Sequence, residues 1–151
     1  RGLQIAIVTN ASKASLKPFL LHALGEELRA HVSVVTSGEE VSHKKPAPDI
    51  YQLACKRLGL SGNECIAVED SAMGMLAAHR AGIAVVVTVN ADTRRQDFSQ
   101  AMLVVNQLGE PDEPCELLPG GAYAPCKPPA CVDLALLETM LAEHQNKASS
   151  T

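Results

Sequence analysis

The stretch His43-Lys44-Lys45-Pro46-Ala47-Pro48-Asp49-Ile50-Tyr51, read together with Val68-Glu69-Asp70-Ser71, decides the fold and the chemistry that we expect of this chain. The first stretch places a lysine directly before a proline-marked helix start, since proline is tolerated in the first turn of a helix. The second stretch places two adjacent carboxylates at the end of an apolar run. A lysine supplies positive charge and paired carboxylates can hold a divalent cation. Together these groups predict a pocket that handles phosphate.

Outward from these two stretches, short apolar runs alternate with helical patterns along the chain. Strands are predicted at 3–8, 32–36, 65–68, 83–89 and 102–105, the last of them at a sheet edge. Helices are predicted from Ser12 or Ser15 towards Gly25, across 46–59 and across 71–81. Strands that alternate with helices in this way require a parallel sheet with right-handed crossovers. The predicted fold class is therefore α/β, with a doubly wound parallel sheet.

The chain divides into three parts by composition. Residues 1–109 carry the alternating strands and helices and form the core. Residues 110–131 contain six of the nine prolines and predict an extended surface segment without regular structure. Residues 132–146 return to a helical pattern, with Leu134, Leu137 and Leu141 on one stripe, and predict an amphipathic helix that docks on an apolar surface.

Composition and charge exclude several classes of function. The 151 residues are 46% hydrophobic and 20% charged, which is typical of one globular domain. The net charge of -4, from 13 basic and 17 acidic residues without a long run of either sign, disfavours nucleic-acid binding. The apolar runs are shorter than the roughly 20 residues that a membrane-spanning helix needs, so no membrane span is expected.

The five cysteines predict reduced thiols and an intracellular, reducing compartment. Their number is odd, and Cys55 and Cys65 fall in a predicted helix and strand. Cys126 and Cys131 could pair or bind a metal, but their spacing matches no strong zinc pattern.

Polar side chains follow three of the predicted strands. Thr9 and Asn10 follow the first strand, Lys45 lies on the loop beyond the second, and Glu69 and Asp70 follow the third. In an open α/β sheet, ligands bind at the carboxyl ends of the strands. The Thr9 hydroxyl and the Asn10 amide can donate to phosphate oxygens, and the Lys45 ammonium can neutralise a developing phosphoryl charge.

The adjacent carboxylates of Glu69 and Asp70 are the sharpest single signal. They repel one another unless something compensates, and Mg²⁺ is the natural compensator because it binds carboxylates, water and phosphate. Each feature also has a plainer alternative. Thr9-Asn10 are residue types that cap helices, either Asp70 or Ser71 could merely cap the helix that follows, and Lys45 alone is compatible with a solvated surface lysine.

Taken together, these motifs resemble the haloacid dehalogenase superfamily. The resemblance lies in Val8-Thr9-Asn10, in 45–51, and in Val68-Glu69-Asp70-Ser71-Ala72-Met73-Gly74 with Ala77-Ala78 and Ala81-Gly82-Ile83. More narrowly, the chain looks like the branch that holds β-phosphoglucomutase and the CbbY-type sugar-bisphosphate phosphatases. Residues 106–111 and 132–135 look like the C-terminal extension of plant and algal CbbY-type proteins, from which a chloroplast stromal location follows.

The resemblance implies a Mg²⁺-dependent phosphatase that acts on a phosphorylated sugar. Thr9 matches the second motif of the family, and Lys45 matches the third. Asp70 matches a magnesium ligand of the fourth motif, with Glu69 sharing that duty or orienting it. In the family, an aspartate attacks the phosphoryl group to form an aspartyl-phosphate, and a second aspartate acts as acid and base.

The sequence departs from the family at the first motif. The Asp-x-Asp-Gly-Thr run that bears the nucleophile does not occur in the chain, nor does the helical cap domain that follows it. Residues 1–109 are therefore expected to be the C-terminal part of the core, incomplete and lacking its first strand, with two sheet edges unpaired. The expected partner is the missing N-terminal part of the same protein or another polypeptide that completes the sheet. The chain alone is expected neither to turn over substrate nor to fold well.

Three functions stay open from the sequence. The first is part of a CbbY-like phosphatase whose nucleophile lies outside this chain. The alternative is a catalytically inactive structural subunit of a larger assembly. A third is a module that binds a phosphorylated ligand through Thr9 and Lys45 without hydrolysing it.

Overall fold

The computed structural model describes residues 2–22, 25–110, 112–123 and 129–149, without the side chains of Phe19 and Leu21. The strands and helices follow the order that the sequence predicts, with one additional α-helix. The elements are β1 (Ile5–Val8), α1 (Lys13–His22), α2 (Gly25–His31), β2 (Val32–Thr36), α3 (Asp49–Leu58), the short 3-10 helix η1 (Gly62–Glu64), β3 (Ile66–Glu69), α4 (Ala72–Arg80), β4 (Ala84–Thr88), β5 (Leu103–Val105) and α5 (Leu134–Ala148).

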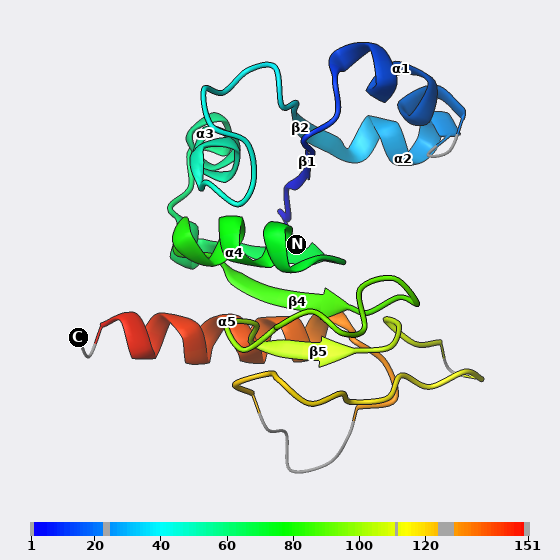
Figure 1. Ribbon diagram of the computed structural model, residues 1–151, viewed down its shortest axis with the longest axis vertical. Coiled ribbons are helices and arrows are strands. Elements are labelled where there is room, and N and C mark those ends of the chain that lie inside the picture. The colour runs from blue at the N-terminus through cyan, green and yellow to red at the C-terminus, as the bar shows by residue number, and fades with distance from the viewer. Residues whose placement is uncertain (1, 23–24, 111, 124–128, 150–151) are drawn as a thin grey trace.

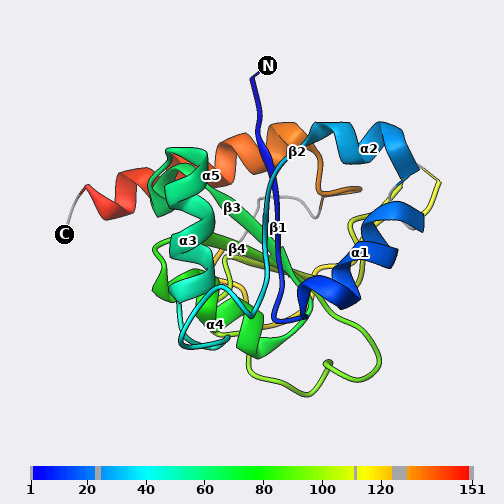
Figure 2. The same ribbon diagram turned by 90° about the horizontal axis from the view of Figure 1, so that it is seen from above.

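All strand pairs are parallel, which confirms the α/β class. They form two separate sheets, one of β1 and β2 and one ordered β3-β4-β5. β1 and β2 run side by side (Figure 2). Within the described residues, the backbone of β1 forms no ladder with that of β3, although both strands line one groove. An unpaired edge on each sheet is the arrangement that we expect of a parallel core that lacks one strand.

Helices cover both faces of the three-stranded sheet (Figure 1). Val85 and Val87 of β4 pack in one cluster with Met75 of α4, whereas Ala84 and Val86 pack in another cluster with Met140 of α5. Because successive strand side chains point to opposite faces, α4 and α5 lie on opposite sides of β4. This burial on both faces explains why the run 83–89 is almost entirely apolar.

A groove of about 1010 Å³ lies between the two free strand edges. Its lining includes β1, β3, the inward face of α3 and one stripe of α5. Ile5 on one edge and Val68 on the other are each 49% exposed. Apolar side chains on an open strand edge are unusual in a stable monomer, because they invite pairing with another chain. The groove is therefore bordered by two free strand edges with exposed apolar side chains.

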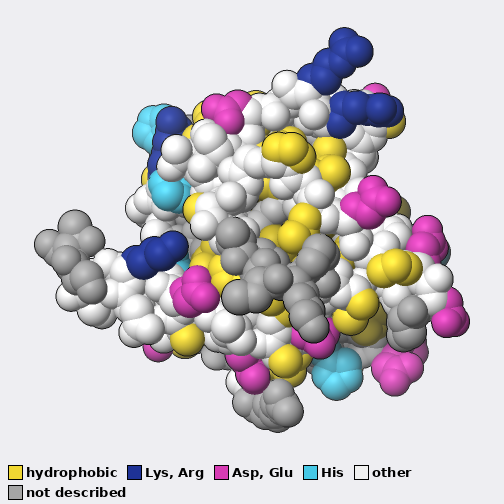
Figure 3. All heavy atoms as spheres, turned by 90° about the horizontal axis from the view of Figure 1, so that it is seen from below, with side chains coloured by type: hydrophobic (Ala, Val, Ile, Leu, Met, Phe, Trp, Pro, Cys, Tyr) yellow, Lys and Arg dark blue, Asp and Glu magenta, His cyan; other side chains and the backbone are white. Residues whose placement is uncertain are grey.

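The C-terminal third of the chain packs on the same sheet. Leu118 N–H donates to Val104 O at 2.9 Å and Tyr123 N–H to Met102 O at 2.7 Å, so this segment covers the outer edge of β5. The Asp133 side chain caps α5 by accepting from Leu136 N–H, and Met140 is fully buried. On the face seen in Figure 3, hydrophobic side chains are exposed in several separate places, and charged side chains of both signs lie mostly towards the rim.

The region before β2 differs from the sequence expectation. We expected one helix that Gly25 either ends or interrupts; instead α1 ends at His22, and Gly25, with a φ of 68°, begins a second helix, α2. Its positive φ, which glycine adopts without strain, lets the chain turn there. Pro18 lies beyond the first turn of α1, where it removes one helical hydrogen bond. The missed signal for α2 is its charge pattern, acidic in the first turn and basic in the last, which suits the helix dipole.

The cysteines of the described part are free thiols, namely Cys55, Cys65, Cys115 and Cys131. Burial raises the pKa of the Cys65 thiol to about 12, which makes it a poor nucleophile at neutral pH. Cys126, which from the sequence could form a disulfide or a metal site with Cys131, lies outside the described residues. In the described ranges, we find no helix with the length and apolar character to cross a membrane.

Candidate functional site

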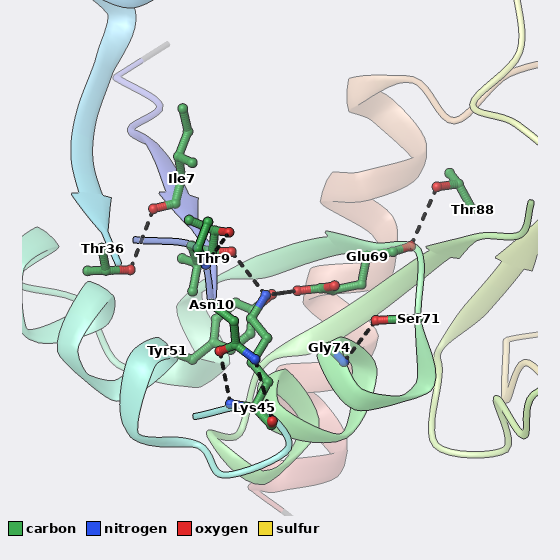
Figure 4. A network of polar contacts seen from close by, with 12 residues as sticks. Ile7, Thr9, Asn10, Thr36, Lys45, Tyr51, Glu69, Ser71, Gly74 and Thr88 are labelled. Atoms are coloured by element: carbon green, nitrogen blue, oxygen red, sulfur yellow. Dashed lines mark hydrogen bonds and ion pairs between the residues drawn. The ribbon is translucent and has the colours of Figure 1, made fainter. Parts of the chain in front are cut away.

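The loop between β2 and α3 carries Lys45 to the carboxyl ends of β1 and β3. Lys45 N–H donates to Asn10 Oδ1 at 3.1 Å, and Asn10 Nδ2 donates back to Lys45 O at 3.5 Å. Arg80 at the end of α4 donates to Pro46 O at 2.9 Å, and the Lys45–Pro46 peptide bond is cis. The side chain that we expected to bind substrate, Asn10, thus uses both its amide oxygen and its amide nitrogen to hold the lysine loop (Figure 4).

The Lys45 side chain points inward. Its ammonium donates to Val8 O at 3.0 Å and to Glu69 Oε1 at 2.5 Å, and it lies 4.9 Å from the centre of the Tyr51 ring. Only 10% of the side chain is exposed. Lys45 is therefore not a solvated surface lysine. A charge-assisted pair and a cation–π contact hold its positive charge at the end of the groove.

Glu69 ends β3 and is the centre of a buried polar network (Figure 4). Its Oε1 accepts from both the Lys45 ammonium and the Tyr51 hydroxyl, and its side chain is only 9% exposed. Burial, together with the negative charge of Glu69, raises the pKa of the Tyr51 phenol above its usual range. Tyr51 was not among the site residues predicted from the sequence. The signal was there, because a phenol on the core face of a helix that begins beside Lys45 needs a polar partner.

Asp70 and Thr9 lie beside this network at the carboxyl ends of β3 and β1. Ser71, and not Asp70, caps α4, because its Oγ accepts from Gly74 N–H at 3.2 Å. The Asp70 side chain is exposed and forms no hydrogen bond or ion pair with the described residues. Thr9 Oγ1 accepts from Ala11 N–H at 3.1 Å, which leaves its hydroxyl proton available to a phosphate oxygen.

Two adjacent carboxylates, Glu69 and Asp70, are the oxygen donors that this part of the chain offers to a cation. No group of three or more metal-binding side chains occurs among the described residues. Mg²⁺ nevertheless keeps several waters and takes only one or two carboxylates together with substrate phosphates. The donor set therefore fits part of a magnesium site, with the remaining ligands supplied from elsewhere.

Four of the five side chains expected to handle phosphate, those of Thr9, Lys45, Glu69 and Asp70, lie together at one end of the groove. Tyr51, which was not expected at the site, also lines the groove, whereas Asn10 is not among its lining residues. The carboxyl ends of β1 and β3 thus bring the Thr9 hydroxyl and the Glu69 and Asp70 carboxylates together, and the loop between β2 and α3 adds the Lys45 ammonium. A site of this composition can bind a phosphorylated ligand, and it lies where open α/β sheets bind ligands.

A second hollow, of about 470 Å³, lies between α1, α2 and β2. Glu40 at its edge accepts from Arg57 at 2.8 Å and pairs with Lys13 at 3.4 Å. The Arg57 guanidinium and the Ser37 N–H lower the pKa of Glu40 to about 2. These contacts join α1, α3 and the loop after β2, so we interpret Glu40 as a structural residue.

Comparison with known proteins connects this site to a family. Residues 1–82, which contain all of the predicted site residues, match the family model of haloacid dehalogenase-like hydrolases. Protein CbbY, plasmid, of Cupriavidus necator is 39% identical over 123 residues, which are 81% of this chain and 48% of that protein. A CBBY-like protein of Arabidopsis thaliana is 36% identical over 112 residues, covering 74% of this chain and 35% of the relative.

A solved structure gives the same relationship in three dimensions. CbbY from Rhodobacter sphaeroides, a mutant in complex with xylulose-(1,5)bisphosphate, superposes with a TM-score of 0.65 at 31% identity. The match covers 70% of this chain and 47% of that one. The chain therefore spans about half the length, or less, of the relatives that it matches.

Proposed function

The chain belongs to the haloacid dehalogenase-like hydrolase family, and from that premise we propose that it is part of a Mg²⁺-dependent, CbbY-like sugar-phosphate phosphatase. The observation that carries the proposal is the network at the end of the groove, where Lys45 reaches both Val8 O and Glu69 Oε1 from a third segment of the chain. A scaffold alone has no need of a buried lysine held at this position. A phosphate-binding pocket does need it.

Each residue has a distinct task in this proposal. Lys45 neutralises negative charge on the phosphoryl group, and Thr9 donates its hydroxyl proton to a phosphoryl oxygen. Asp70 supplies a carboxylate to Mg²⁺, and Glu69 either shares the cation or orients Lys45. When bound, Mg²⁺ offsets the negative charge of the phosphate oxygens.

The nucleophile in this proposal lies on a segment outside the chain, since no Asp-x-Asp run occurs in its sequence. The groove between β1 and β3 is where that segment would bind. A strand placed there would pair with both free edges in the parallel direction, and helices on both sides require it to be apolar on both faces. Its carboxyl end would then emerge beside Lys45. The segment is the N-terminal part of the same protein or a separate polypeptide.

Substrate and location are proposed by similarity. The Rhodobacter relative is in complex with xylulose-(1,5)bisphosphate, which favours a bisphosphorylated pentulose over other sugar phosphates. A chloroplast stromal location is proposed from the resemblance of residues 106–111 and 132–135 to plant and algal CbbY-type proteins.

The test is a complementation assay for phosphate release. The chain with Mg²⁺ and a pentulose bisphosphate is expected to release no phosphate. Addition of a segment that bears an apolar strand followed by Asp-x-Asp-Gly-Thr and a cap domain should restore release, and Lys45→Met should abolish it. The exposed Lys56→Met, on the outer side of α3, is the matched control. Turnover by the chain alone, or by the complemented Lys45→Met variant, contradicts the proposal.

The alternative is a catalytically inactive structural subunit. The absence of the nucleophile from the sequence and the free strand edges favour it. In that case a partner strand binds in the groove, the edges of β1 and β3 become protected from hydrogen exchange, and no sugar phosphate is hydrolysed. The same assay therefore separates the two functions.

A further inference from the structure

We infer that Tyr51 and Gly74 are positioning residues, which hold the Glu69 carboxylate against Lys45 and so keep it from binding the cation. The inference rests on the proposed function and deepens it, because it divides two adjacent carboxylates between two tasks. It depends on the way in which the two oxygens of Glu69 are used.

One oxygen of Glu69 already has two donors. Oε1 accepts from the Lys45 ammonium at 2.5 Å and from the Tyr51 hydroxyl. The Tyr51 ring also lies under the ammonium, 4.9 Å from it. Tyr51 thus contacts both members of the pair and fixes their relative position. A cation that approached Oε1 would have to displace these donors, and Mg²⁺ loses its waters reluctantly.

The other oxygen of Glu69 lies against the first turn of α4. A methyl group in place of the Gly74 hydrogen would overlap the carboxylate, 2.8 Å from Oε1 and closer still to Cδ and Oε2. Only glycine leaves room for the carboxylate in this position. The space beside the α4 backbone therefore accommodates Glu69 in the orientation that faces Lys45.

Asp70 has the opposite surroundings. Its side chain is exposed at the end of the groove, and within the described part of the chain no donor holds it. Ser71 performs the capping task that Asp70 would otherwise have at the start of α4. Of the two carboxylates, Asp70 is the one that a hydrated cation can reach without breaking an existing contact.

The test uses the chain complemented by the segment that carries the missing strand, as in the phosphate-release assay. It measures how fast Lys45 is acetylated by a water-soluble anhydride, with and without Mg²⁺, and each lysine is followed by mass spectrometry. Lys45 should react slowly in the wild-type chain, and millimolar Mg²⁺ should leave its rate unchanged because Glu69 stays with Lys45. In Tyr51→Phe the rate should rise at least about fivefold, since a hydrogen bond to a charged group is lost. Mg²⁺ should raise that rate further by drawing the released Glu69 away.

Two controls distinguish a local effect on the Lys45–Glu69 pair from a general loss of folded structure. Lys56, exposed on α3, should react at an unchanged rate in every variant, and Tyr123→Phe should leave Lys45 as slow as in the wild type. A faster Lys56 would mean that α3 had unfolded. In that case the Mg²⁺ response of the wild-type chain alone decides the inference.

Two results overturn the inference. One is an acceleration of Lys45 by Mg²⁺ in the wild-type chain, which would mean that Glu69 binds the cation. The other is an unchanged Lys45 rate in a folded Tyr51→Phe chain. Failure of the phosphatase proposal would appear instead as absent phosphate release after complementation, which these labelling rates do not measure.

Discussion

The substitution Gly74→Ala tests the polar network at its most confined point. In an ordinary helix interior this change is stabilising by about 1 kcal/mol, because glycine is a poor helix former. Here the added methyl would overlap the Glu69 carboxylate. The carboxylate is the far end of a flexible side chain and can rotate away, so the overlap itself costs little. The cost is the loss of its contacts with Lys45 and Tyr51.

The magnitude follows from the burial of the pair. Lys45 and Glu69 are 10% and 9% exposed, and separating a buried pair of this kind typically costs about 3–5 kcal/mol. Subtracting the gain of about 1 kcal/mol in helix propensity, we expect Gly74→Ala to lower the free energy of unfolding by about 2–4 kcal/mol. Urea denaturation followed by circular dichroism measures this value on the free chain. If the free chain unfolds without a cooperative transition, the measurement is made on the chain with the complementing segment bound in the groove.

A double-mutant cycle supplies the control. In a Glu69→Ala background there is no carboxylate for the methyl to displace, so Gly74→Ala should there be stabilising by about 1 kcal/mol. The sign of the Gly74 effect should therefore reverse between the two backgrounds. Destabilisation by the same amount in both would refute the reasoning, because the cause would then be the α4 backbone and not Glu69.

Three further predictions concern packing and pH. Met140→Ala should lower the free energy of unfolding by about 2–4 kcal/mol in thermal denaturation, because the Met140 side chain is fully buried under the sheet. The control Met73→Ala should change it by less than about 0.5 kcal/mol, because Met73 is 56% exposed. Burial raises the pKa of Tyr51, so the unfolded chain releases the phenol proton at a lower pH than the folded chain does. The free energy of unfolding should therefore fall as the pH rises above about 10. Urea denaturation between neutral and alkaline pH should show a smaller fall in Tyr51→Phe. The pKa of Glu40 is lowered from 4.5 to about 2. The contribution of ionised Glu40 to the free energy of unfolding is therefore fully present above pH 4.5 and is lost as the pH falls through about 2. Glu40→Gln should be less stable at neutral pH by about 1 kcal/mol, since solvent reaches this pair, and the difference should shrink in acid; a constant difference would contradict the assignment.

Much of the architecture could be predicted because it depends on local patterns. The run 83–89 predicted a strand buried on both faces, and β4 is covered by α4 on one side and α5 on the other. The end of an apolar run at Glu69 and the start of a helix after Ser71 predicted the turn that carries the carboxylates. In each case, the period of the side chains along the sequence reflects the environment of each face. The helix α2 was missed because it buries no side chain, so no apolar period marks it.

The partners of the site residues could not be predicted in the same way. Sequence reasoning placed Asn10 on the substrate, but its amide holds the main chain of Lys45, 35 residues away. It left open whether Lys45 was a surface lysine, and it gave no role to Tyr51 or Gly74. Each of these facts depends on which side chains meet across the fold, and spacing along the chain does not record that.

The sequence by itself determined which residue types follow each strand. It therefore predicted that a lysine and two carboxylates, those of Lys45, Glu69 and Asp70, lie at the carboxyl end of a parallel sheet. It also contains no Asp-x-Asp run, so the strand that bears the nucleophile is predicted to lie outside these 151 residues. The tertiary structure alone decided that Glu69 pairs with Lys45 while Asp70 remains exposed, and that the two sheets face one another across a groove. The physical reason is that strand order follows from local pattern and chain connectivity, whereas the partner of a buried charge is set by packing between elements distant in sequence.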